Sequence, residues 1–540
     1  MTVQPESCLR EPRRGTSVTL LALGLLTAAS AAVEPLGELV ALPGLWFWIA
    51  VMAAALATPF LVQRRFGAFE PFSPVTYPVW TYLAPVFVVG SALLASGIAK
   101  QAPDLIPVPV DLQYCLAMAY LVVGWTGLLI GYYCRWGDDL GARVRRRLPD
   151  TRWTTVELRV SAALLLAAGL GLYWLAFRLG VIGHQRLATV GPWDGLLIFL
   201  SFVSHVAAFL LWFSLFERPS WTGGERALAV GLYLLGPLSL TISASRAGLV
   251  THLLLLALAF RLAGRRIRWR HVILFGVLGA ASLAIGTIWS TTYRLSKGDE
   301  APIYRTEEQS AEPRADSTRP THRDSQPQEG GTQARPEGAR ASNLELVTET
   351  AEIVAERGLT DNVLFVLRNV AVRIEITSSV AMLVAKYRLL RPMEEQTGLA
   401  GNIWRDTWTA PIPRFLWPDK PKVSDARTYS LVYFDYGGTS FAMTPVGDLL
   451  RNFGPVGVPL GMALLGFALR LLYRTLVAGP VARPAPAAIY AIGLMNINYE
   501  GFYGSLLPTV MRLVAVTGGA LVAVHLGVVV QRRIRRSHRS

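Results

Sequence analysis

The sequence has few charged residues and very few cysteines. Aspartate, glutamate, lysine and arginine make up 16% of its 540 residues, whereas they account for about a quarter of an ordinary soluble protein. The hydrophobic fraction is 52% and the mean hydropathy is +0.38, so we expect a membrane protein. The three cysteines, Cys8, Cys115 and Cys134, are too few and too scattered for a disulfide framework or a cysteine-based metal site.

A metal centre and a nucleic-acid partner are both disfavoured. The histidines lack the HExxH-type spacing that brings two imidazoles to one helix face, and we predict no metal ion and no other cofactor. The net charge is +15, but the basic residues stand at the ends of apolar runs and do not form one patch. That distribution is typical of a membrane protein and not of a nucleic-acid binder.

Twelve apolar runs are candidates for membrane spans, because a helix needs about 20 apolar residues to cross the hydrocarbon core. They cover residues 17–35, 44–62, 77–98, 112–133, 158–178, 194–216, 227–243, 247–263, 272–291, 455–477, 485–498 and 506–530. The first run also resembles a signal peptide, since it follows Arg13 and Arg14 and ends in small residues. We predict a retained span, with cleavage as the alternative.

The charges that flank these runs predict the orientation of the chain. Lysine and arginine are retained on the cytoplasmic side, and basic clusters at 143–147, 261–270 and 532–539 then put both termini in the cytoplasm. The long insert between the ninth and tenth runs falls on the opposite side.

Composition divides the chain into four parts. We predict an N-terminal membrane bundle of nine spans (1–291), a disordered polar tether (292–343), an extracytoplasmic loop that carries amphipathic helices and a catalytic segment (344–454), and a C-terminal bundle of three spans (455–540). The tether has too few apolar residues to offset the entropy lost on ordering.

Residues 362–388 approach the length of a span but contain Arg368, Arg373, Glu375 and Lys386. A charge at the bilayer centre costs about 2.5–3.5 kcal/mol, which favours an amphipathic helix in the outer interface. A thirteenth span is the alternative, and it would reverse the sidedness of the polar segment after it unless another run failed to cross.

The segment from 409 to 454 is polar, aromatic and cationic, and we predict that it carries the function. Four prolines in PIPRFLWPDKP restrict its backbone and exclude regular helix. Cationic side chains bind phosphate, and aromatic side chains stack on sugar rings. The candidate substrate-binding residues in this segment and next to it are Arg405, Arg414, Lys420, Lys422, Arg451, Trp417 and Tyr433. This combination suggests a glycan on a lipid diphosphate, and a surface turn with ordinary ion pairs is the alternative.

Three further residues are candidates for chemistry. Arg246 opens a short span among small residues and either points into a cavity between helices or snorkels to the interface. Asp448 lies one helical turn before Arg451 and is the leading general base, because burial raises the pKa of a carboxyl group. A helix cap or an ion pair with Arg451 is its alternative role. Glu500 is the reserve carboxylate.

Three stretches resemble the Wzy-type O-antigen or oligosaccharide repeat-unit polymerases, namely SASRAG (243–248), IPRFLWPDKP (412–421) and GDLLRNFGPVGV (447–458). The resemblance implies an all-α, GT-C-like membrane fold at the outer face of the bacterial inner membrane. Its substrates would be oligosaccharides on undecaprenyl diphosphate, with a flippase and a chain-length regulator as protein partners and neither metal ion nor nucleotide sugar. The chain departs from the family pattern in its long tether and in having Asp448 where glutamate is expected.

The implied reaction moves a growing chain from its undecaprenyl diphosphate to a sugar hydroxyl of a fresh lipid-linked unit. Arg246 and Arg414 would stabilise the departing diphosphate, Lys420, Lys422 and Arg451 would support them, and Asp448 would accept the hydroxyl proton. An O-antigen ligase, which delivers finished glycan to another acceptor, and a transporter of lipid-linked glycan are the alternatives. A transporter predicts internal repeats and charges near the midplane, and neither stands out.

Overall fold

The computed structural model describes most of the chain. The described residues are 15–67, 69–98, 111–148, 153–179, 181, 193–243, 246–296, 352, 370–371, 373–409, 412, 416–417, 419–421, 426–435, 441–477 and 482–537. Every regular element within these ranges is a helix. Nearly all of the predicted tether lies outside them.

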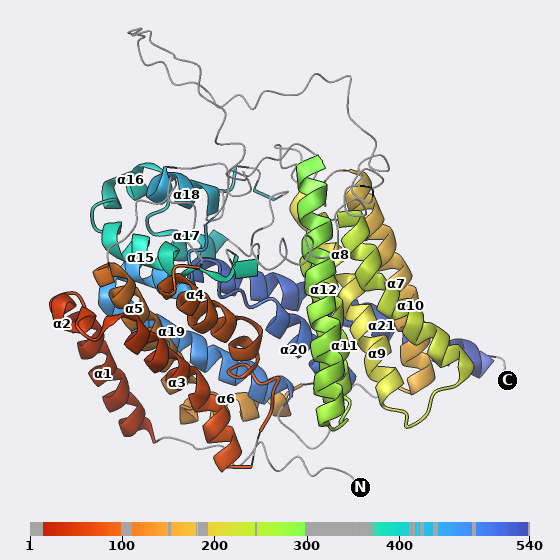
Figure 1. Cartoon of the computed structure of the whole chain (residues 1–540). Helices are drawn as coiled ribbons and strands as arrows, with labels where there is room; N and C mark the ends of the chain where they lie inside the picture. The colour runs from red at the N-terminus through yellow and green to blue at the C-terminus, as the bar shows by residue number, and fades with distance from the viewer. Residues whose placement is uncertain are drawn as a thin grey trace, which may run out of the picture.

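The helices follow one another in the order shown in Figure 1. They are α1 (Thr16–Ala32), α2 (Gly37–Ala41), α3 (Gly44–Arg65), the π-helices η2 (Val79–Leu83) and η3 (Pro85–Gly90), α4 (Ser91–Ala95), α5 (Asp111–Tyr132), α6 (Arg135–Arg146), α7 (Thr155–Arg178), α8 (Asp194–Ser201), α9 (Val203–Phe216), α10 (Gly223–Ser243), α11 (Arg246–Leu262), α12 (Trp269–Ser296), α15 (Thr377–Lys386), α16 (Arg391–Gln396), α17 (Asn402–Thr409), α18 (Ala426–Phe434), α19 (Pro445–Leu476), α20 (Pro484–Met495) and α21 (Tyr503–Ser537).

Seven helices among the described residues are long and apolar enough to cross a membrane. They cover Gly44–Arg65, Asp111–Tyr132, Thr155–Arg178, Leu196–Phe216, Trp269–Ser290, Pro445–Leu476 and Tyr503–Ile534. The other predicted runs also fall on helical elements, but these lie outside the set of seven. The prediction of a helical protein is therefore confirmed, and the seven long apolar helices are consistent with a membrane-embedded chain. The count of twelve spans stays a prediction.

The predicted amphipathic segment 362–388 is not one continuous helix. Glu375 and Ile376 are non-helical and separate the turn before them from α15. The Glu375 carboxylate accepts a hydrogen bond from the Ser378 amide at 2.8 Å, so it satisfies a donor in the first turn of α15, where helices have unpaired N–H groups. Residues 362–369 lie outside the described part of the chain.

The buried apolar side chains form two clusters. One joins α3, α5, α15, α18 and α19 as far as Leu469, and the other joins α7, α9, α11, α20 and α21. α19 belongs to both, since Leu469 lies in the first cluster and Tyr473 in the second. The C-terminal helices thus pack among those of the first 291 residues, in contact with α5, α6 and α9.

Among the described helices, α5 and α19 have the most extensive contact. Gly127 and Gly131 of α5 face the backbone of Pro459 and Ala463, while Gly466 of α19 faces that of Leu128. A Cβ atom at Gly131 or Gly466 would overlap the facing carbonyl oxygen. Small residues at this spacing let membrane helices approach closely, because lipid supplies no hydrophobic force between them and packing must hold them together.

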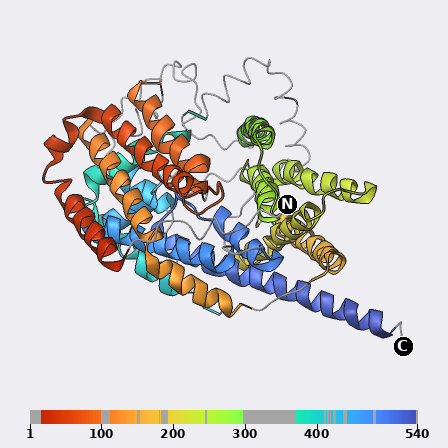
Figure 2. The same ribbon diagram turned by 90° about the horizontal axis from the view of Figure 1, so that it is seen from below.

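The short helices α15 to α18 gather at one end of the molecule, and the arginine-rich helix α6 lies at the other (Figure 1). The last residues of α21 also lie away from the short helices in this view. Seen from below, α21 extends lengthwise away from the rest of the bundle to the C-terminus (Figure 2). This arrangement gives the molecule one polar, loop-rich end.

Gly131→Ala should weaken the fold, because its methyl group forces α5 and α19 apart. We expect the unfolding free energy to fall by about 1–3 kcal/mol, as overpacked sites do, with a lower midpoint of thermal unfolding in detergent. Gly276→Ala on α12 is the matched control, since nothing lies within 4 Å of a Cβ atom there. Equal midpoints for the two variants would contradict the close contact.

Candidate functional site

The predicted functional motif begins α19 as a short helical arm. Thr444, with φ +62°, caps the arm and its hydroxyl accepts a hydrogen bond from the Gly447 amide at 3.1 Å. Gly454, with φ +69° and ψ −168°, interrupts the helix, a conformation that glycine adopts without steric cost. The arm therefore runs from 445 to 453 and is turned relative to the membrane helix after it.

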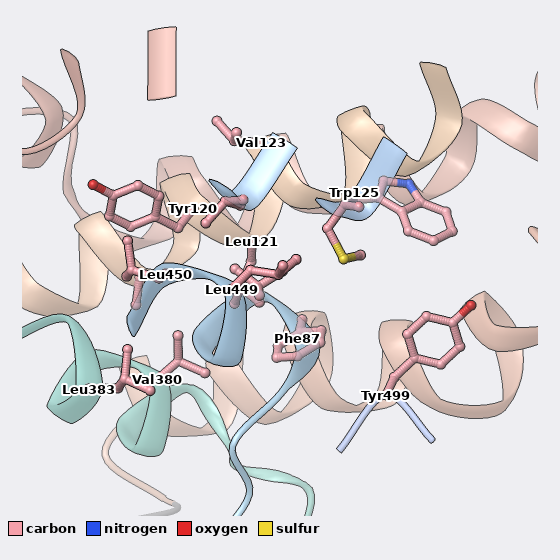
Figure 3. Close-up of a cluster of buried hydrophobic side chains, with 14 of the residues drawn as sticks. Phe87, Tyr120, Leu121, Val123, Trp125, Val380, Leu383, Leu449, Leu450 and Tyr499 are labelled. Atoms are coloured by element: carbon pink, nitrogen blue, oxygen red, sulfur yellow. The ribbon is translucent and has the colours of Figure 1, made fainter. Parts of the chain in front are cut away.

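The arm has two faces. Leu449 and Leu450 point into an apolar cluster that also holds Leu121 of α5 and Val380 and Leu383 of α15 (Figure 3). Its other face carries Asp448, Arg451 and Asn452, and the side chains of Asp448 and Arg451 are both 0% exposed.

The Arg451 guanidinium is surrounded by acceptors. Nε and Nη2 donate to Asp448 Oδ1 at 3.0 and 2.8 Å. Nη1 donates to Glu394 Oε1 at 3.0 Å and to the Leu399 carbonyl at 3.1 Å, and Nη2 also reaches Asn402 Oδ1 at 2.6 Å. A buried charge is tolerated only when it is paired and hydrogen-bonded, and these acceptors come from α16, its following turn, α17 and α19.

Both carboxylate oxygens of Asp448 also accept hydrogen bonds. In addition to Arg451, its Oδ1 accepts from Asn452 Nδ2 at 3.1 Å, and its Oδ2 accepts from the Gly504 amide at 3.0 Å and from Asn402 Nδ2 at 3.3 Å. Both oxygens are occupied by donors and the group has no access to solvent. The geometry favours the ion-pair role that the sequence left open, and the cap role belongs to Thr444.

Glu394 of α16 is the second buried carboxylate of this network and was missed from the sequence. Its Oε1 accepts the hydroxyl of Tyr433 at 2.8 Å, and Arg391 Nη1 lies 3.7 Å from its Oε2. Arg451 thus pairs with both buried carboxylates, and Arg391 lies between Glu394 and its nearer partner Glu395. Burial, and then the nearby Glu394 charge, raise the pKa of Tyr433, which keeps the phenol protonated as the donor.

Other predicted cations are also used within the protein. Lys420 is only 5% exposed and its amine donates to the Ile412 carbonyl at 2.9 Å, closing its own loop. Arg405 donates to Asp406 at 3.1 Å and to the Gly398 carbonyl. Trp417 is 37% exposed and is the predicted binding residue with the most accessible side chain among those described.

Glu500 supports the arm from the C-terminal side. Its backbone carbonyl accepts the amides of Met443 and Thr444 at 3.2 and 3.3 Å, and its carboxylate pairs with Arg373 at 2.7 Å. Of the remaining predicted residues, Arg414 and Lys422 lie outside the described part of the chain. Arg246 is the first residue of α11, but its side chain is likewise outside.

Glu375 is a carboxyl group that no sequence pattern marks as an acid or base. It is fully buried before α15, and beyond its bond to Ser378 the neighbouring phenol of Tyr114 lies 3.3 Å from the Ser378 hydroxyl. Desolvation raises the pKa of Glu375 to about 7, although hydrogen bonds from Ser378 and Thr377 partly oppose this. A carboxyl group with that pKa can both take up and release a proton near neutral pH.

An apolar cleft of about 570 Å³ opens between α1, α3 and α5. Its lining is mostly aliphatic, with Thr58, Thr126 and Tyr133 as the polar exceptions, and its volume lies in the range of ligand pockets, about 300–1,000 Å³. Ala29 lies at the cleft, and the next residue, Ser30, donates to the Pro455 carbonyl at 2.6 Å. The cleft is therefore connected through α1 to the junction between the arm and the rest of α19.

A second polar cluster lies just after the ends of α1 and α15, against the middle of α5. Glu34 accepts hydrogen bonds from Tyr120 at 3.1 Å and Tyr387 at 2.6 Å, and it pairs with Arg388 at 2.5 Å. The Arg388 side chain is 70% exposed, so its charge faces outward from this cluster. Among the described residues, no group of three or more His, Cys, Asp or Glu side chains is placed to hold a metal ion.

Comparison of the chain with protein-family models, with curated proteins and with solved structures gives no match. The resemblance to repeat-unit polymerases therefore rests on the three motifs alone. Of these, GDLLRNFG supplies three side chains of the buried network, whereas Glu394 and Asn402 lie about fifty residues earlier in segments without a recognisable pattern. Only helix packing brings them to Arg451.

Arg451→Ala should destabilise the protein strongly, because it leaves Asp448 and Glu394 buried without their common partner. We expect a loss of about 3–5 kcal/mol in the unfolding free energy, measured by denaturation in detergent. Arg135→Ala removes a solvent-exposed pair with Asp139 and should cost at most about 1 kcal/mol. Similar losses for the two variants would refute a structural role for Arg451.

Glu375→Gln should remove a pH dependence of stability. The protonated carboxyl group is favoured in the fold, so its contribution is complete below pH 4.5 and is lost as pH rises through about 7. The variant should therefore be more stable than wild type at pH 8, by up to about 3 kcal/mol, and little different at pH 5. Thermal unfolding midpoints at the two pH values measure this, with Glu395→Gln at an exposed site of α16 as control. Parallel profiles for wild type and Glu375→Gln would exclude the buried, protonated state.

Proposed function

We propose that this protein is a glycosyltransferase that polymerises oligosaccharide repeat units carried on undecaprenyl diphosphate. The observation that carries the proposal is an apolar cleft between membrane helices, joined through Ser30 and Pro455 to an end of the protein rich in cations and aromatic residues. A substrate with a polyprenyl tail, an anionic diphosphate and a sugar chain requires these three environments next to one another.

The orientation follows from the distribution of basic residues. The arginine-rich helix α6 and the C-terminal arginines lie away from the short helices α15 to α18 (Figure 1). If the basic ends are cytoplasmic, the short helices face the periplasm of the bacterial inner membrane. The remaining apolar helices would complete a GT-C-like scaffold of about twelve spans.

The polyprenyl tail would occupy the cleft, and the diphosphate would meet cations at the polar end. Arg246 and Arg414 are the proposed diphosphate ligands, with Lys422 in support. Arg388 and Arg391, whose side chains are 70% and 40% exposed, add accessible positive charge at the same end. Trp417 would offer a face for a sugar ring. Lys420, Arg405 and Arg451 would act by stiffening the segment, because their donors bond within the protein.

In the proposed reaction a sugar hydroxyl of one lipid-linked unit attacks the anomeric carbon of the growing chain. The new C–O bond forms as the bond from that carbon to the diphosphate breaks, and the diphosphate leaves with the bonding electrons. The hydroxyl proton passes to a carboxylate. Asp448 already accepts from four residues. The remaining candidates are Glu500, whose side chain is 27% exposed, and Glu375, which is fully buried but has a pKa near neutrality.

The direct test uses purified protein in lipid nanodiscs with a synthetic undecaprenyl diphosphate repeat unit. We expect a ladder of products on a gel. Ala55→Phe, which fills the cleft, should slow ladder formation by at least about tenfold, since a misplaced substrate reacts poorly. Val277→Phe, on an exposed face of α12, is the matched control and should leave the rate unchanged.

Absence of a ladder with wild-type protein would refute the polymerase. Transfer of preformed polymer to a separate acceptor, without a ladder, would identify a ligase, and movement of the lipid-linked unit across the bilayer without product would identify a transporter. Unchanged polymer length and yield with both Arg246→Ala and Arg414→Ala would refute the diphosphate assignment alone.

A further inference from the structure

Helix α17 has an unusual distribution of side chains. Among its eight residues only Trp404 and Trp408 are exposed, at 61% and 75%, and they are one turn apart on one face. The opposite face is polar yet buried, with Asn402 and Asp406 both 0% exposed. The usual order for a helix on a water-facing surface, apolar side inward and polar side outward, is inverted.

This helix is held rigidly, so its tryptophans cannot turn inward. Asn402 bonds Arg451 and Asp448, and the Gly401 amide donates to Asn452 Oδ1 at 3.1 Å. On its other flank Ile403 packs so closely against Gly504 that a Cβ atom there would come within 2.9 Å of the Ile403 Cα.

The exposed tryptophans continue an apolar stripe on α19. The exposed residues of α19 are all apolar and recur every three or four positions, namely Phe453, Val456, Leu460, Leu464 and Ala468. From Val456 to Ala468 the stripe extends about 18 Å along the helix, so it faces lipid over much of a membrane span. Phe453, at its outer end, meets Trp404 edge to face with ring centroids 6.4 Å apart.

We propose that α17 lies in the headgroup region of the bilayer, with Trp404 and Trp408 inserted among the lipids next to the α19 stripe. Tryptophan prefers this depth, because its ring is largely apolar while its indole N–H can bond to headgroups and water. The contact would fix the Arg451 network at the level of lipid headgroups. The inference depends on membrane embedding alone and not on the proposed glycan chemistry.

A second copy of this chain and a sugar chain are the competing occupants. The bilayer is favoured over both, because the tryptophans continue the lipid-facing stripe of α19. The apolar surface from Leu464 to Trp408 is continuous, so we expect lipid to cover all of it. A tryptophan that stacks on a sugar ring must be accessible from water. Trp404 instead contacts Phe453 at the outer end of the lipid-facing stripe.

Spin labels on the full-length protein in nanodiscs of phosphatidylethanolamine and phosphatidylglycerol can test this. Trp404→Cys and Trp408→Cys, each in a background with the three native cysteines replaced, should collide with oxygen several-fold more than with a polar nickel complex. Leu464→Cys is the lipid-facing reference. Glu395→Cys is the water-facing reference, because Glu395 lies on α16 at the same end and its side chain is 63% exposed. A label there should collide more often with the nickel complex than with oxygen.

The proposal would be overturned if the ratio of oxygen to nickel-complex collisions at positions 404 and 408 matched the ratio for Glu395→Cys. Spin–spin broadening between molecules would overturn it in favour of a second copy, and immobilisation only after a repeat-unit glycan is added would favour a sugar platform. The native tryptophans give an independent measurement with brominated lipids in the same discs. The double variant Trp404→Phe, Trp408→Phe should lose part of the fluorescence quenching, and unchanged quenching would also contradict the insertion.

Discussion

The polar end of this protein depends on the burial of one guanidinium group. Arg451 has no contact with solvent, and a buried charge persists only if acceptors surround it. Those acceptors come from Asp448 on its own helix, Glu394 on α16, the Leu399 carbonyl and Asn402 on α17. The positions of three helices are therefore set by the geometry of one planar side chain, whose donors point in fixed directions.

Because buried charges need internal acceptors, the charged side chains of this end fall into two groups. One group is buried and structural, and the other remains accessible to a ligand. The buried cations of the functional segment are occupied by internal acceptors, which makes that segment stiff. Arg388 and Arg391 also pair with carboxylates, but their side chains stay 70% and 40% exposed. Glu375, whose pKa lies near neutrality, lies outside the network. The proposed glycosyl transfer would use such a stiff framework, because charge stabilisation in a transition state requires preorganised groups.

The membrane imposes a second constraint, since lipid gives no hydrophobic force between helices and close packing must replace it. Glycines allow α5 and α19 to approach until their backbones touch, and α19 continues from one apolar core into the other. The helix that carries the arm is thereby anchored in both apolar clusters. Its lipid-facing stripe leads directly to α17.

The sequence by itself indicated the helical, apolar character of the chain, the helical turn shared by Asp448 and Arg451, and the start of an apolar run at residue 455, because apolar periodicity and local spacing act within a few residues. It could not reveal the partners of Arg451, since Glu394 and Asn402 are about fifty residues away and carry no local signal. Nor could it show that Lys420 and Arg405 bond within the protein, or that burial raises the pKa of Glu375. Tertiary packing decided these points, because desolvation and the supply of acceptors depend on which distant segments meet and not on residue type.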